Sequence, residues 1–282
     1  MILQTPQKSV IFVGLFREVI VMENKVKDLK IYGSGSSSGG EYNKIRIMGE
    51  GRINGDINCT DLKINGEGTV EGNLKAVNNV IIMGEGMLDG NVDCTDFKVN
   101  GEGGVDGNLK AGGNITIRGE ADVKGNLKAQ KVKVQGELEV RGELFADEAK
   151  ITGNISTDGD CNAEIFTVEG GLTIDGLLNA DIVKINLYWP CKVHEIGGSE
   201  ITVKKSGKLS FLGLKLIVTP GGQNELTADI IEGDSIYLEN TTAKVVRGTD
   251  VTIGSGCKIE LVEYKNSFKQ DEKSEIGANK KI

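Results

Sequence analysis

A repeated pair of glycines constrains the fold of this chain more than any other sequence feature. Cut before a recurring glycine, residues 49–186 form eight rows of 17 or 18 residues that align in phase. The rows begin at Gly49, Gly66, Gly84, Gly101, Gly119, Gly136, Gly153 and Gly170. A second glycine lies six positions into every row, from Gly55 in the first to Gly176 in the last. A fixed period of this kind predicts a solenoid, in which each row is one structural unit.

Apolar residues occupy fixed columns between these glycines. The row that begins at Gly119 has its apolar and small residues at Val123, Leu127, Ala129, Val132 and Val134. Apolar residues two positions apart follow the period of a β-strand, and glycine suits the corners because it reaches positive φ without steric cost. The handedness of parallel crossovers favours a right-handed coil. We therefore predict an all-β protein: a three-sided, right-handed parallel β-helix with 17–18 residues per coil and irregular C-terminal coils.

The chain divides into four predicted segments. Residues 1–28 are expected to be a disordered N-terminal extension, 29–186 a regular β-helix, 187–264 an irregular continuation, and 265–282 a disordered polar tail. Arg17, Glu18 and Val19 can be encoded by a sequence resembling a bacterial ribosome-binding site, so we hypothesise that the cellular protein starts at Met22. The apolar run 10–16 is too short to span a bilayer, which needs about 20 residues, although it could serve as a membrane-surface anchor.

Two segments need the register to be interpreted. Leu29 and Ile31 precede Gly33 as Ile45 and Ile47 precede Gly49, so the Gly/Ser run at 33–40 is predicted to form a weakly packed first coil. Beyond the regular rows, Gly198, Gly233 and Gly248 each begin a similar strand. Because Gly198 and Gly233 are 35 residues apart, we interpret this interval as two rows, with residues 208–218 as the intervening one.

Composition excludes several classes of function. The formal net charge of −8 argues against a nucleic-acid partner, which would need a basic face. The five cysteines lack the paired spacing of a disulfide framework or zinc site. Cys59 and Cys94 fall in a small inward column, so we expect them to fill the core of a protein in a reducing cytoplasm. We recognise no catalytic set, phosphate loop or metal-ligand spacing, and predict no cofactor, nucleotide or enzymatic activity.

Polar residues also form columns. An acidic column runs through Glu50, Glu67, Glu85, Glu102, Glu120 and Glu137. We interpret it as a solvated edge that discourages lateral clumping. Asn73, Asn91, Asn108 and Asn126 form a second column, and we expect amide hydrogen bonds between their stacked side chains. The single histidine, His194, lies near the irregular Trp189–Pro190 turn and is assigned a structural role.

The glycine rows resemble a known family. Residues 49–57 and 66–74 are similar to the in-phase Gly-x-apolar-x-Gly repeat of bactofilins, the bacterial polymer-forming cytoskeletal proteins. The resemblance covers about residues 22–264, and the section 187–264 departs from the regular pattern. It implies a right-handed β-helix that polymerises end to end without nucleotide. It also implies a cytoplasmic scaffold for cell-shape, cell-wall or motility proteins, often peripheral at the inner face of the membrane, with cell-wall enzymes as further partners.

The physics of a β-helix supports such a polymer independently. Each end exposes unpaired strand backbone and an apolar cross-section, and no obvious capping helix is present in the sequence. The predicted interface consists of Leu29, Ile31, Ile45 and Ile47 at one end and Ile253, Ile259 and Leu261 at the other. A charge at Ile45 or Leu261 is expected to weaken assembly and leave the rod folded. Two alternatives stay open: a β-helix enzyme acting on polysaccharide, and a binding module associated with the membrane or cell wall.

Overall fold

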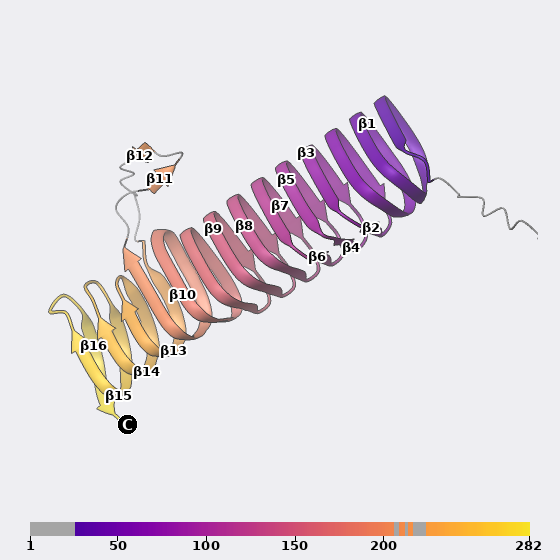
Figure 1. Ribbon diagram of the computed structural model, residues 1–282. Coiled ribbons are helices and arrows are strands. Elements are labelled where there is room, and N and C mark those ends of the chain that lie inside the picture. The colour runs from indigo at the N-terminus through magenta and orange to yellow at the C-terminus, as the bar shows by residue number, and fades with distance from the viewer. Residues whose placement is uncertain (1–25, 206–208, 212–213, 217–223) are drawn as a thin grey trace, which may run out of the picture.

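The protein is an elongated stack of parallel strands. The computed structural model describes residues 26–205, 209–211, 214–216 and 224–282, so Met22 and the apolar run 10–16 lie outside the described residues. In the described residues, all elements of regular secondary structure are β-strands. The strands wind into a β-solenoid of about 12 turns, which Figure 1 shows as a rod with the chain advancing steadily from one end to the other.

Sixteen strands make up the described chain. The first nine are β1 (Leu29–Glu71), β2 (Leu74–Ala76), β3 (Asn79–Leu88), β4 (Val92–Cys94), β5 (Asp96–Val105), β6 (Leu109–Ala111), β7 (Asn114–Val123), β8 (Leu127–Val140) and β9 (Leu144–Thr157). The others are β10 (Cys161–Lys205), β11 (Leu209–Phe211), β12 (Leu214–Leu216), β13 (Leu226–Leu238), β14 (Thr241–Ile253), β15 (Lys258–Gln270) and β16 (Glu275–Lys281). All except β11 and β12 belong to one 14-stranded sheet that wraps around the rod.

Strand pairing confirms the predicted register of the regular rows. Gly66 lies beside Gly84, Gly84 beside Gly101, and Gly101 beside Gly119. The same column continues from Gly119 through Gly136 and Gly153 to Gly170. Each coil therefore advances the chain by one row, and residues that share a column in the sequence are neighbours in space.

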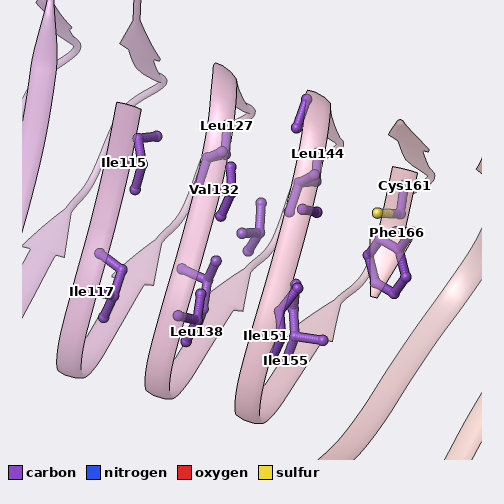
Figure 2. Close-up of a cluster of buried hydrophobic side chains, with 14 of the residues drawn as sticks. Ile115, Ile117, Leu127, Val132, Leu138, Leu144, Ile151, Ile155, Cys161 and Phe166 are labelled. Atoms are coloured by element: carbon purple, nitrogen blue, oxygen red, sulfur yellow. The ribbon is translucent and has the colours of Figure 1, made fainter. Parts of the chain in front are cut away.

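The core is a continuous aliphatic column inside three walls. In the coil that begins at Gly136, three buried pairs face inward, one from each wall: Leu138 with Val140, Leu144 with Ala146, and Ala149 with Ile151. Exposed or half-buried residues alternate with them along the strands. Figure 2 shows Leu138, Leu144 and Ile151 of this coil, together with Ile115, Val132 and Phe166 of nearby coils, pointing into the same interior. Burial of each large aliphatic side chain contributes about 1.5–3 kcal/mol, so the stack is stabilised along its whole length.

One glycine illustrates why the corner column tolerates no side chain. Gly119 has a φ of +121°, which L-residues rarely adopt. A Cβ on Gly119 would lie 2.2 Å from the carbonyl oxygen of Gly101 in the preceding coil. Backbone therefore packs against backbone at this corner.

The interval between Gly198 and Gly233 corrects the predicted row at 208–218. Gly198 pairs directly with Gly233, and Val203 pairs with Leu238, so the two glycines lie in adjacent coils. The additional residues leave the solenoid instead, and β11 and β12 pair antiparallel in a separate two-stranded sheet. In Figure 1 this hairpin stands away from the side of the rod. The spacing of 35 residues is thus one short coil plus an insert.

The C-terminal segment corrects the predicted disordered tail at 265–282. The second half of β15 pairs with β14, and β16 pairs with β15, for example Ile276 beside Ile259. Phe268 and Ile276 pack against the core from positions that are only partly buried. The remaining side chains of β16 are exposed, because no described strand covers this last coil. Its polar composition reflects an end position in the solenoid rather than disorder.

Candidate assembly surfaces

The N-terminal end is a thin coil with little apolar side-chain surface. Gly33 stacks on Gly49, since a Cβ on Gly49 would lie 2.4 Å from the Gly33 carbonyl oxygen. The Gly/Ser coil covers Ile53 and Ile57 of the next coil, whose exposed fractions are only 0% and 1%. Leu29 is half-buried against the core, and no described strand lies on its outer side. The end therefore offers open backbone with a small apolar contribution from its first strand.

The C-terminal end is more apolar. The rings of Tyr264 and Phe268 stack with centroids 5.5 Å apart, and both pack against the core together with Ile276. β16 is the edge strand of the large sheet, so its outer N–H and C=O groups have no neighbouring described strand. Tyr264 accepts a backbone hydrogen bond of 2.9 Å from Ile282, which holds the last residues on this coil. An aromatic and aliphatic patch thus lies beside an unpaired strand edge.

The structure places some of the predicted interface residues in the first coil and the others inside the stack. Leu29 and Ile31 belong to the first coil, with Ile31 7% exposed, but Ile45 and Ile47 are covered, at 1% and 0%. Strand pairing places Ile253 under Gln270, Ile259 under Ile276 and Leu261 under Ala278. These three residues therefore lie one coil inside the described end. A charge at Ile45 would disturb the core, so it cannot serve as a surface probe.

The acidic column is in direct register along one wall. Glu67, Glu85, Glu102, Glu120 and Glu137 pair successively across five coils, and all are exposed. Glu50, at the N-terminal end of the column, accepts a long 3.5 Å hydrogen bond from the Ser34 hydroxyl. Among the described residues, the ion pairs lie in other columns, such as Lys131–Glu148 at 2.8 Å. Each rod thus carries a continuous stripe of negative charge.

The asparagine column forms the expected ladder, with backbone donors as its main feature. Asn91 N–H donates to the Asn73 side-chain carbonyl at 3.0 Å, Asn108 N–H to Asn91 at 2.9 Å, and Asn126 N–H to Asn108 at 2.8 Å. The Asn91 side-chain amide also donates to the Asn73 side-chain oxygen at 3.1 Å. The ladder begins on the Asp56 carboxylate, which accepts from Asn73 N–H at 2.7 Å. Each rung satisfies a corner N–H that no strand partner reaches.

Removing one rung should lower stability measurably. Asn91→Ala leaves the Asn108 N–H without its acceptor and removes the side-chain donor to Asn73, whose oxygen keeps the backbone N–H of residue 91. We expect a loss of about 1 kcal/mol in the free energy of unfolding, because both sites are exposed to water. Glu85→Ala, in the acidic column of the same coil, is the control and should be neutral. Urea denaturation followed by circular dichroism measures both. Equal midpoints for the two variants would contradict a stabilising ladder.

The residues weighed for chemistry lie in structural surroundings. His194 is more than half exposed, with Nδ1 3.6 Å from Asp229 Oδ2 and Nε2 3.7 Å from Glu195 Oε1. Asp229 also binds Lys244 at 2.9 Å, and this hydrogen bond lowers the pKa of its carboxyl group. The described part of the chain contains no group of three or more metal-ligating side chains. These contacts link coils through surface charges.

The cysteines are core residues, as predicted for Cys59 and Cys94. Cys59, Cys94, Cys161, Cys191 and Cys257 are all buried and free. Burial, with a smaller contribution from Asp61, raises the pKa of Cys59 to about 12, and burial likewise raises that of Cys94 to about 12. A thiol with so high a pKa is a poor nucleophile at neutral pH. Packing therefore accounts for these residues.

Comparison with known families gives a match across the regular coils. The family model described as "Bactofilin: Polymer-forming cytoskeletal" matches twice, at residues 21–107 and 97–179. The two overlapping matches span more than half of the chain and follow the internal repeat. They extend from the N-terminal end of the described solenoid into β10.

Two curated relatives from Bacillus subtilis (strain 168) are similar over shorter stretches. The uncharacterized protein YhbF is 46% identical over 90 residues, which is 32% of this chain and 34% of YhbF. The uncharacterized protein YhbE is 40% identical over 89 residues, which is 31% of this chain and 35% of YhbE. The matched region thus covers about a third of each relative's length. No solved structure is significantly similar. The described residues include no helix long and apolar enough to cross a membrane.

Proposed function

The chain belongs to the bactofilin family of polymer-forming cytoskeletal proteins, and from this premise we propose that it forms a filament by end-to-end stacking of solenoids without nucleotide. The observation that carries the proposal is the pair of open ends. The first coil of β1 and the edge strand β16 each lack a described strand on their outer side. Stacking would pair these edges and cover Leu29 at one end and Phe268 and Ile276 at the other.

The dimensions of the coil favour stacking over a lateral interface. Strands of neighbouring coils lie about 4.8 Å apart, so an end contact can continue the ladder with the spacing it already has. The side walls carry charged columns such as Glu67, Glu85 and Glu102, which oppose close lateral approach between like faces. The open strand edges at the two ends are therefore complementary, whereas the charged walls are not, so the filament should grow along the rod axis.

We further propose that the filament is a scaffold in the cytoplasm, at the inner face of the membrane. A filament of identical solenoids repeats every surface feature along its length, so a weak contact on one subunit becomes a multivalent array. The partner classes we expect are cell-wall enzymes and the membrane surface, in the service of cell shape, cell-wall synthesis or motility. Co-isolation of the filament with such enzymes from native cells, lost in an assembly-defective variant, is the expected result.

Electron microscopy tests the filament directly. The purified chain, in buffer without nucleotide, should show filaments by negative stain above a threshold concentration. Addition of ATP or GTP should leave the filaments unchanged, because assembly draws only on strand pairing and apolar contact. Sedimentation as a monomer across the whole accessible concentration range would overturn the proposal.

A further inference from the structure

A column of basic side chains runs along one wall of the rod, over the coils of β5 to β9 (Figure 1). Lys98, Thr116, Lys133 and Lys150 are successive neighbours in strand register, and their side chains point outward. Ile81 of β3 precedes Lys98 in the same column and is only partly buried. None of the three lysines forms an ion pair with any described residue. The column therefore carries uncompensated positive charge in a chain whose net charge is −8.

A second column, two residues earlier in each strand, forms the other side of a trough. Its two carboxylates already have partners, because Asp96 accepts the backbone N–H of Asn114 at 2.7 Å and Glu148 pairs with Lys131 at 2.8 Å. The trough between the columns has a volume of about 490 Å³, and its floor consists of the strands that carry both columns. Since each column passes from coil to coil, the trough runs parallel to the rod axis, with the free lysines along one side.

The length of this trough fits an extended polypeptide. Lys98 and Lys150 are three coils apart, which is about 14 Å at about 4.8 Å per coil. Alternate residues of an extended strand repeat every ~7 Å, so the first and third of three such residues are also about 14 Å apart. The flexible side chain of Lys133 can reach the middle one. A segment with glutamates at three alternate positions therefore matches the three lysines, and Ile81 offers an apolar contact one coil beyond them.

Carboxylates around the trough argue against a broad anionic partner. Asp96 and Glu148 lie on its other side. Glu102 and Glu137, in the acidic column, follow two of the lysines by four residues and are exposed on the adjoining wall. A bilayer surface or a nucleic-acid duplex is wider than the trough and would bring its phosphates against these carboxylates. An extended peptide is narrow enough to contact the lysines alone.

We propose that the trough binds an extended acidic segment of a partner protein, with three alternate carboxylates against Lys98, Lys133 and Lys150 and an apolar side chain beside Ile81. Because the trough lies on a wall, it leaves both ends of the rod free for stacking. Binding by a single subunit does not depend on assembly. Avidity rests on the proposed function, since a filament repeats the trough in every subunit and a partner with several acidic segments would bind more than one.

Fluorescence anisotropy tests the proposal with the full chain. The probe is a labelled peptide, Leu-Thr-Glu-Thr-Glu-Thr-Glu-Thr-Leu, whose terminal leucines allow either direction to place one beside Ile81. The control peptide has glutamine in place of each glutamate. Wild type should bind the glutamate peptide at least about tenfold more tightly than the glutamine peptide, and this preference should fall at high salt because the contacts are exposed charges.

Charge reversal locates the site. Lys98→Glu combined with Lys133→Glu should weaken the glutamate peptide at least about tenfold, and should bind a peptide with lysine at the three positions more tightly than wild type does. Lys75→Glu combined with Lys110→Glu is the matched control, because it makes the same charge change at two exposed lysines of another wall. The control should keep the affinity of wild type for the glutamate peptide. Circular dichroism should show that both variants are folded.

Three results would overturn the proposal: no preference of wild type for the glutamate peptide, equal affinity of the two double variants for it, or equally tight binding of a single-stranded oligonucleotide of the same charge. The last would assign the wall to general attraction of anions. Negative stain of the same samples reports filaments independently, so a failure of assembly is distinguished from a failure of peptide binding.

Discussion

Gly119→Ala is expected to destabilise the solenoid by at least about 3 kcal/mol, and to prevent folding of the coils around it. Two effects act together at this position. The φ of +121° disfavours any residue with a Cβ, and the added atom would lie 2.2 Å from the Gly101 carbonyl oxygen. Neither neighbour can rotate away, because both are backbone atoms in a continuous ladder. Relief of the contact requires the two coils to separate.

A nearby glycine provides the control. Gly112 has no positive φ, and a Cβ there would meet only the Cys94 carbonyl oxygen at an ordinary 3.8 Å. Gly112→Ala should therefore change stability by less than about 0.5 kcal/mol. Urea denaturation and far-ultraviolet circular dichroism of both variants measure the difference. Similar stability for the two variants would show that the corner can relax, and would contradict the packing inferred for the glycine column.

The regular coils could be predicted because each position of the repeat has one structural role. Glycine is required where backbone meets backbone, as at Gly119, and aliphatic residues are required where three walls converge, as at Leu127 and Val132. Because these roles repeat every 17 or 18 residues, they set the strand register. The strand pairing confirms this register from Gly66 to Gly170. The asparagine ladder was predicted from the same repetition, as amide hydrogen bonds between stacked side chains, but its backbone N–H donors were not foreseen.

The insert escaped prediction because a solenoid period is inferred from spacing. The 35 residues from Gly198 to Gly233 equal two rows in length, and alternating apolar residues at 209–216 suit a hairpin as well as a coil. One signal could have distinguished them. Residues 204–223 contain no acidic residue, whereas the wall strands of the regular rows carry charges of both signs. Charge composition could therefore have marked the segment that leaves the rod, which only the strand pairing identified.

The C-terminal end was misjudged for a related reason. Disorder is predicted from low hydrophobicity and high charge, and β16 has both, with Lys280 and Lys281 near its end. A terminal coil is covered on one side only, so few of its side chains need to be apolar, while its backbone is held by the coil beneath. Ile276 and Phe268 supply the remaining core contacts. The predicted interface residues Ile253, Ile259 and Leu261 consequently lie one coil inside the described end.

Charges at the corrected ends are expected to abolish filaments. Leu29→Asp combined with Ile276→Asp places a carboxylate on each end of the rod, at positions that pack against the core and face no described strand. Stacking would bury each charge without a partner, at a cost of several kcal/mol. A penalty of about 3 kcal/mol corresponds to roughly a 100-fold rise in the concentration needed for assembly.

Val77→Asp is the matched control, because Val77 is apolar but 67% exposed on the wall, where end-to-end stacking makes no contact. The double variant should sediment as a folded monomer, with a strand-rich circular dichroism spectrum and no filaments by negative stain, while Val77→Asp assembles as wild type does. The single variants show which ends pair. If like ends pair, each single variant should lose long filaments but keep dimers formed through its unmutated end. If unlike ends pair head to tail, each single variant should remain a monomer. Filaments of normal length from the double variant, or loss of filaments in Val77→Asp alone, would place the interface on the walls and contradict assembly through the open ends.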